Sequence, residues 1–197
     1  MNKDSALNLL HSNMQNANLR KHCYAVGITM GAIYDYLSSQ NKLEDKSLDR
    51  ETWEVLGIIH DSDYEITKED WNRHTLLTLD WIKDLGIDPT DHLYRAMQSH
   101  NAKRTGFAGP QTQMEWALEC VDELTGFLVA CTLVLPSKKI ADLTLESVKK
   151  KWKQPAFAKG VIREQTDQVE EKLGIDFDTF VNVTLKSMQA NAEVLGL

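Results

Sequence analysis

The feature that most constrains the fold is the spacing of apolar residues between positions 18 and 39. Apolar side chains recur there at steps of three, four or seven, which is the repeat of one face of a helix. These side chains are Leu19, Val26, Met30, Ile33, Tyr34 and Leu37. No stretch alternates apolar and polar residues as a half-buried strand does. The sequence therefore predicts an all-α protein, with His22 on the inward stripe of this long helix.

Start and stop signals predict further helices along the chain. Ser47 or Asp49 can cap a second helix that carries His60 near its end. Other helices are expected over residues 70–85, from Pro89 to about His100, over 112–135, around 145–152 and 162–173, and from Phe177 onward. Residues 103–110, KRTGFAGP, are predicted as a loop because of their Gly and Pro content. We expect a bundle of roughly eight helices.

Length and composition limit the function classes. The 197 residues suit a single domain covering 1–197. Asp and Glu total 29 against 22 Lys and Arg, and the resulting net charge of -7 disfavours nucleic-acid and anionic-lipid partners. The most apolar stretch, residues 124–135, is shorter than the roughly 18 to 20 residues of a membrane-spanning helix.

Cellular location is predicted from the first residues and from the cysteines. The N-terminal sequence MNKDSALNLLHS lacks the uninterrupted apolar run of a signal peptide. Cys23, Cys120 and Cys131 have no C-x-x-C spacing and lie among apolar residues, which is typical of buried, reduced thiols. We therefore expect a cytoplasmic protein.

The residues that indicate chemistry are histidines and carboxylates. Motifs for phosphate loops and nucleophile elbows are absent, whereas His60 and Asp61 follow an apolar run within WEVLGIIHDSDYE. A divalent cation would stabilise a carboxylate and a neutral imidazole in such a buried position. His22 and Asp122 on other helices can complete the ligand set. The alternative for each residue alone is a hydrogen-bonded core histidine or a paired core acid.

The order of His22, His60-Asp61 and Asp122 resembles the H…HD…D signature of the HD superfamily, whose members most like this chain are helical, metal-dependent phosphohydrolases. The segments HDSDYE, DELTGF and residues 133–164 are similar to a subgroup described only as predicted HD hydrolases. The resemblance implies an HD-domain-like helical bundle in which these four residues bind one divalent ion. Imidazole and carboxylate ligands suit Mn, Fe, Co, Ni and Zn alike.

The same resemblance suggests further site residues. In two-metal relatives, histidines between the HD pair and the last Asp bind a second ion, and His74 and His100 lie in that interval. A second ion, bridged by Asp61, is therefore an open alternative to a single one. Asp63 and Glu65 follow the pair closely and could act as general base or orient a water molecule. Capping of the next turn is the other interpretation of these two acids.

A basic segment could bind substrate. Residues 137–163 contain eight basic side chains and only two acidic ones in an otherwise acidic chain. Lys151 and Arg163 are the candidates for binding substrate phosphate, since a guanidinium group can bind phosphate through two hydrogen bonds. The alternative is an ordinary solvated helix face.

These observations lead to one predicted function and two alternatives. The first is hydrolysis of a phosphate ester or anhydride of a small, nucleotide-like molecule, with Asp61 and Asp63 among the catalytic groups and a divalent metal ion as cofactor. The first alternative is an HD-type di-iron oxygenase, which requires His74 and His100 as ligands. The second alternative is a non-catalytic nucleotide-binding module.

Overall fold

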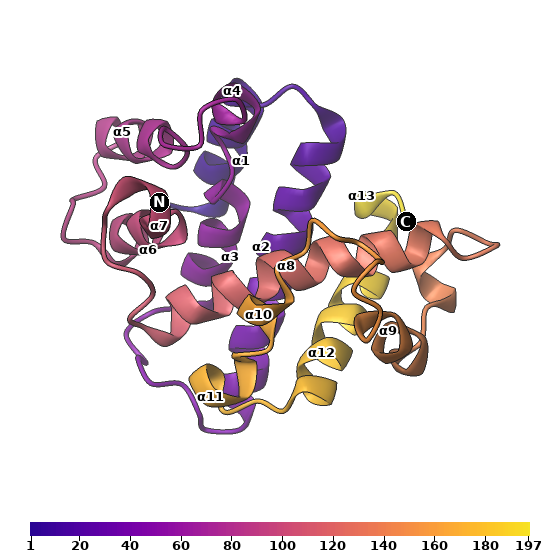
Figure 1. The fold of residues 1–197 in the computed structure, drawn as a ribbon. Helices are drawn as coiled ribbons and strands as arrows, with labels where there is room; N and C mark the ends of the chain where they lie inside the picture. Colours follow the sequence, from indigo (N-terminus) through magenta and orange to yellow (C-terminus); the bar gives the residue numbers. More distant parts are fainter.

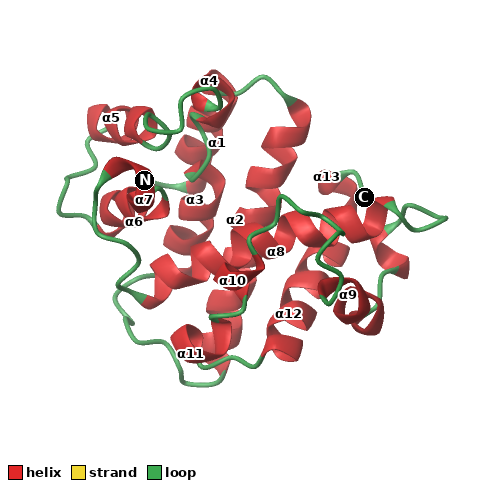
Figure 2. Ribbon diagram, viewed as in Figure 1, coloured by secondary structure: helices red, strands yellow, loops and turns green.

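The computed structural model describes residues 1–197 as helices joined by turns and loops, without any strand (Figure 2). The predicted all-α fold is therefore confirmed. Eight helices have eight residues or more: α1 (Lys3–Asn13), α2 (Ala17–Ser39), α3 (Arg50–Ile59), α5 (Leu76–Asp84), α6 (His92–His100), α8 (Gln113–Leu133), α9 (Leu145–Trp152) and α12 (Phe177–Ala190). The shorter segments are α4 (Tyr64–Thr67), α7 (Ala102–Thr105), η1 (Ile140–Asp142), α10 (Arg163–Thr166), α11 (Val169–Leu173) and α13 (Ala192–Leu195).

Polar side chains fix where the long helices begin. The Asp49 carboxylate accepts a hydrogen bond from the backbone N–H of Thr52 at 2.8 Å and caps α3, as its sequence position predicts. Asp91 caps α6 in the same way. At the start of α8, Thr112 and Glu115 form a reciprocal capping box. These caps place the starts of three helices that carry or precede residues of the site.

Three predicted segments differ from the structure. The helix expected over residues 70–85 begins only at Leu76, because turns occupy the preceding residues and Thr75 has a left-handed φ of 73°. The helix expected over 162–173 is divided into α10 and α11, and the indole N–H of Trp152 donates to Asp167 at the break. Residues 103–105, which were predicted as the start of a loop, instead belong to the short helix α7.

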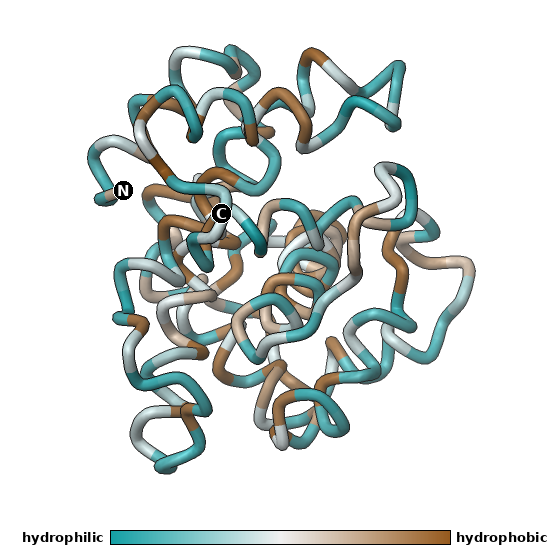
Figure 3. Tube along the Cα trace, turned by 90° about the vertical axis from the view of Figure 1, so that its left-hand side faces the viewer, coloured by the Kyte–Doolittle hydropathy of each residue, from teal (hydrophilic) through white to brown (hydrophobic).

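Helix α2 is the central element of the fold. It packs against α3, α8 and α12, which surround it in Figure 1. The buried apolar side chains form one continuous core, and the hydrophobic stretches of the trace lie largely within the helices in Figure 3. All three cysteines are buried and free, which confirms their predicted burial. No helix combines the length and the apolar character required to cross a bilayer.

Helices α2 and α3 approach each other closely at two glycines. A Cβ atom on Gly57 would lie 2.7 Å from Cα of Gly27, and a Cβ on Gly27 would lie 3.0 Å from the Glu54 carbonyl oxygen. Backbone atoms cannot yield to such contacts, so the spacing of the two helices requires glycine at Gly57. This close packing sets the separation of the polar side chains farther along both helices.

Candidate metal centre

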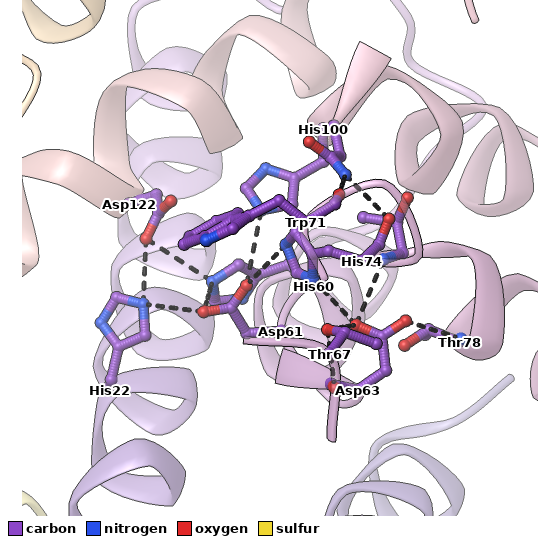
Figure 4. A network of polar contacts seen from close by, with 12 residues as sticks. His22, His60, Asp61, Asp63, Thr67, Trp71, His74, Thr78, His100 and Asp122 are labelled. Carbon is purple, nitrogen blue, oxygen red and sulfur yellow. Dashed lines mark hydrogen bonds and ion pairs between the residues drawn. The ribbon is translucent and has the colours of Figure 1, made fainter. Parts of the chain in front are cut away.

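Helices from separate parts of the chain bring six histidine and aspartate side chains together (Figure 4). They are His22 of α2, His60 and Asp61 at the end of α3, His74 before α5, His100 at the end of α6, and Asp122 of α8. The structure thus brings together all six residues that the sequence singles out as metal ligands.

The close contact of α2 and α3 places the first two histidines. His60 caps the C-terminus of α3, and its Nδ1 donates to the Gly57 carbonyl at 2.7 Å. His22 lies on the facing side of α2, and the centroids of the two imidazole rings are 5.2 Å apart. The chain turns directly after His60, because Ser62 N–H bonds back to the Ile59 carbonyl. That turn directs Asp61 toward the histidines.

Asp61 lies at the centre of the cluster. Its Oδ2 atom is 3.7 Å from Nε2 of His22 and 3.6 Å from Nε2 of His60. Its Oδ1 atom is 3.2 Å from Nε2 of His74 and 3.6 Å from Nε2 of His100. The two oxygens of one carboxylate therefore face two different pairs of imidazoles.

Asp122 completes the half of the cluster nearer to α2. Its Oδ1 atom is 2.9 Å from Nε2 of His22 and 3.5 Å from Nε2 of His60. Three overlapping triples have ligand atoms within 4.8 Å of one another: His22, His60 and Asp61; His60, His100 and Asp122; and Asp61, His74 and His100. Clusters of this composition could hold a metal ion.

Two imidazoles are hydrogen-bonded to the protein on their far side, and a third faces a carboxylate there without a hydrogen bond. His60 Nδ1 donates to a backbone carbonyl, and His74 Nδ1 donates to Oδ1 of Asp63 at 2.8 Å. His100 Nδ1 lies 3.4 Å from Oε1 of Glu119. Each ring therefore presents Nε2 to the central carboxylates. Metal-binding histidines commonly have this arrangement, because an acceptor at one ring nitrogen orients the other nitrogen toward the ion.

Asp63 is fully buried behind His74 rather than exposed to the cavity. Besides His74 Nδ1, it accepts the backbone N–H groups of Thr75 and Thr78, each at 3.1 Å. These bonds stabilise the left-handed backbone at Thr75, a conformation that β-branched residues rarely adopt. Asp63 thus positions His74, and its oxygens are not available to activate water as the sequence suggested.

Glu65, the other acid considered as a base, also lies away from the cluster. Its carboxylate accepts the backbone N–H groups of Gln15 and Asn16 at 2.6 and 2.9 Å. These two residues precede α2, so Glu65 anchors the connection between α1 and α2. Glu65 therefore has a structural role, but it does not cap the turn that follows it, as the alternative supposed.

Opposite charges dominate the electrostatics of the cluster. Burial raises the pKa values of Asp61 and Asp122, but the neighbouring histidines outweigh burial and hold both pKa values well below the usual range. Burial lowers the pKa of His100, whereas the nearby carboxylates of Asp61 and Glu119 raise it well above its ordinary value. The same carboxylates also raise the pKa values of His22 and His74 against the effect of burial.

The cluster forms part of the wall of a cavity of about 470 Å³. Residues between the end of α3 and the middle of α8 line it, together with residues from the segment 160–165. They include Asp61, Tyr64, Trp71, His74, His100, Asn101, Lys103, Arg104, Gly109, Pro110, Glu119, Asp122, Glu123, Gly160, Ile162 and Gln165. Two of these, Lys103 and Arg104, are cationic. Cavities of this size accommodate small molecules.

The two predicted phosphate ligands lie elsewhere. The Arg163 guanidinium donates to the carbonyls of Trp152, Gln154 and Phe157, so it holds a loop together. The Lys151 ammonium lies 4.4 Å from the centroid of the Phe157 ring. Neither residue lines the cavity. Their place in the basic segment and its resemblance to the hydrolase subgroup favoured them, whereas the signal for Lys103 and Arg104 is that they follow His100 by three and four residues.

Glu123 is a further acid in the cavity that the sequence did not indicate. Its carboxylate accepts the Ile162 backbone N–H at 2.7 Å. Burial and the neighbouring charge of Asp122 raise its pKa to about 7. Near neutral pH this group therefore contributes less negative charge to the cavity wall than a solvated glutamate does.

No protein-family model, curated protein or solved structure matches the chain.

Proposed function

We propose that this protein is a divalent-metal-dependent hydrolase of a phosphate ester or anhydride of a small molecule. The observation that carries the proposal is the convergence of tethered imidazoles on Asp61 and Asp122 in the wall of an open cavity. The H…HD…D resemblance points to the same chemistry. Cationic side chains at the same cavity favour an anionic substrate.

The donor set fits a divalent cation. His60 Nε2 is buried and has no hydrogen-bond partner, although it lies 3.6 and 3.5 Å from carboxylate oxygens of Asp61 and Asp122. A cation held by these atoms would give the orphaned nitrogen a partner and neutralise both carboxylates. Under the proposal, His22, His60, Asp61 and Asp122 hold one ion. Asp61, His74 and His100 hold a second.

Each group then has a role that follows from its position. When bound, the cations would polarise a phosphoryl group and lower the pKa of a water molecule. Lys103 and Arg104 bind the non-bridging phosphate oxygens, because these cations line the same cavity as the carboxylates. Asp63 and Glu119 orient His74 and His100 from behind. Lys103 and Arg104 thus replace Lys151 and Arg163 as the proposed phosphate ligands.

A metal add-back assay tests the function. The protein is stripped with chelator, loaded separately with Mn, Fe, Co, Ni or Zn, and incubated with a panel of phosphate monoesters, diesters and nucleoside polyphosphates. We expect phosphate release with at least one metal and its loss in Asp61→Ala. Asp49→Asn, which preserves the exposed cap of α3, is the matched control. Equal activity of wild type and Asp61→Ala would refute the proposal, as would no release with any metal.

The di-iron oxygenase remains the second candidate because the same ligand set fits it. Both His74 and His100 approach Oδ1 of Asp61, as an iron pair bridged by this carboxylate requires. The same add-back experiment separates the two functions. Activity with redox-inert Zn favours hydrolysis, whereas an iron charge-transfer band with oxygen consumption favours the oxygenase.

A further inference from the structure

A large aromatic side chain lies exposed at the wall of the cavity. Trp71 lines the cavity together with Asp61, His74 and Asp122, yet 47% of its surface is accessible to solvent. In the view of Figure 4, the indole extends over the cluster toward Asp122. Packing against other residues therefore covers only part of the surface of this side chain.

The indole is nevertheless held in place from two directions. Its ring centroid lies 5.4 Å from that of Tyr64 and 5.8 Å from that of His74, both edge to face. The Asn101 side-chain amide donates to the Trp71 carbonyl at 2.8 Å and to the His74 carbonyl at 2.9 Å. The backbone that carries the indole is thus bonded to the residue that follows His100, beside the cluster.

We propose that Trp71 is the stacking platform for the base of a nucleoside phosphate. The inference rests on the proposed function and specifies its substrate class. An exposed indole at the cavity wall can stack on a planar ring, and stacking on aromatic side chains is favourable for every nucleobase. Pro110 and Ile162 add apolar surface to the same cavity, whereas Lys103 and Arg104 supply positive charge for the phosphate.

The test compares ligands that differ only in the base. Wild type, Trp71→Ala and Trp71→Phe are assayed with the five common nucleoside 5′-monophosphates and with ribose 5-phosphate, which has the same scissile ester without a base. Trp116→Ala is the matched control, since Trp116 is a partly exposed tryptophan outside the cavity. Binding of the same compounds to the metal-loaded proteins is measured by equilibrium dialysis. Metal content and melting temperature verify that each variant keeps its site.

The expected result is selective for the base. Trp71→Ala should lower kcat/KM and affinity for the best nucleotide by about tenfold to a hundredfold and change those for ribose 5-phosphate by less than about threefold. Trp71→Phe should retain an intermediate value, and Trp116→Ala should resemble wild type. Equal losses on both compounds, or equal binding of both by wild type, would overturn the proposal.

The two proposals fail separately. Absence of phosphate release from every compound would refute the hydrolase function, while the dialysis measurement still decides the stacking role. Nucleotide binding that depends on Trp71 without turnover would support the platform alone. Turnover of ribose 5-phosphate and the nucleotides with no dependence on Trp71 would support the hydrolase and refute the platform.

Discussion

Replacing Asp63 by Asn should weaken metal binding from a position outside the ligand cluster. The two carboxylate oxygens accept hydrogen bonds from His74 Nδ1 and from the backbone N–H groups of Thr75 and Thr78. The Asn side chain has nearly the same shape but only one acceptor oxygen. If this oxygen keeps the bonds to His74 and Thr75, the amide NH₂ group faces the buried N–H of Thr78.

The size of the effect follows from these bonds. An unsatisfied buried donor costs about 1 to 3 kcal/mol, which corresponds to a melting temperature lower by about 2 to 12 °C for a chain of this length. Loss of a carboxylate behind a metal-binding histidine lowers metal affinity by about tenfold to a hundredfold. Both effects should therefore occur in Asp63→Asn, although this residue does not line the cavity.

Competition titrations with a chromophoric chelator measure the metal affinity, and calorimetry measures the melting temperature. Asp49→Asn makes the same chemical change at an exposed helix cap, where Asn serves as well as Asp. It should leave both values close to those of wild type. If Asp63→Asn binds metal and melts like wild type, Asp63 does not position His74.

Three further predictions concern packing, phosphate binding and pH. Gly57→Ala should destabilise the protein by about 1 to 3 kcal/mol or more, measured by urea unfolding, because its Cβ would lie against the backbone of Gly27; wild-type stability would contradict the close contact of α2 and α3. Arg104→Ala should raise KM for a phosphate ester with unchanged metal content, whereas Arg163→Ala should lower the melting temperature and leave KM unchanged; the reverse pattern would restore Arg163 as the phosphate ligand. Metal affinity measured from pH 5 to 8 should fall as pH falls, because the raised pKa of His100 keeps it protonated until the metal displaces the proton; an affinity independent of pH would exclude His100 as a ligand.

The helices and the ligand set could be predicted from the sequence, and this has a physical reason. Burial of one helix face leaves a repeat in the chain, and α2 runs over Ala17–Ser39, within one residue of the predicted start. A histidine and an aspartate that end an apolar helix also stand out, because isolated burial of such groups is unfavourable. The predicted ligands His22, His60 and Asp122 accordingly lie together in the structure.

The direction in which a side chain points could not be predicted from the sequence in the same way. Asp61 and Asp63 are two residues apart, yet one faces the histidines and the other lies behind His74, where its partners come from residues 74–78. Arg163 lies in a basic segment, but three backbone carbonyls bind its guanidinium. Charge density along a chain does not reveal such partners, nor does it show that Lys103 and Arg104 line the cavity.

Metal stoichiometry tests the central claim most directly. The chelator-stripped wild type and Asp61→Ala are each equilibrated with a divalent metal, passed through a desalting column and subjected to elemental analysis, with circular dichroism to verify the helical fold. Because the two oxygens of Asp61 face two pairs of histidines, we expect about two ions per chain in wild type and fewer than one in the folded variant. Equal metal content in both proteins, or no metal in wild type, would contradict the account.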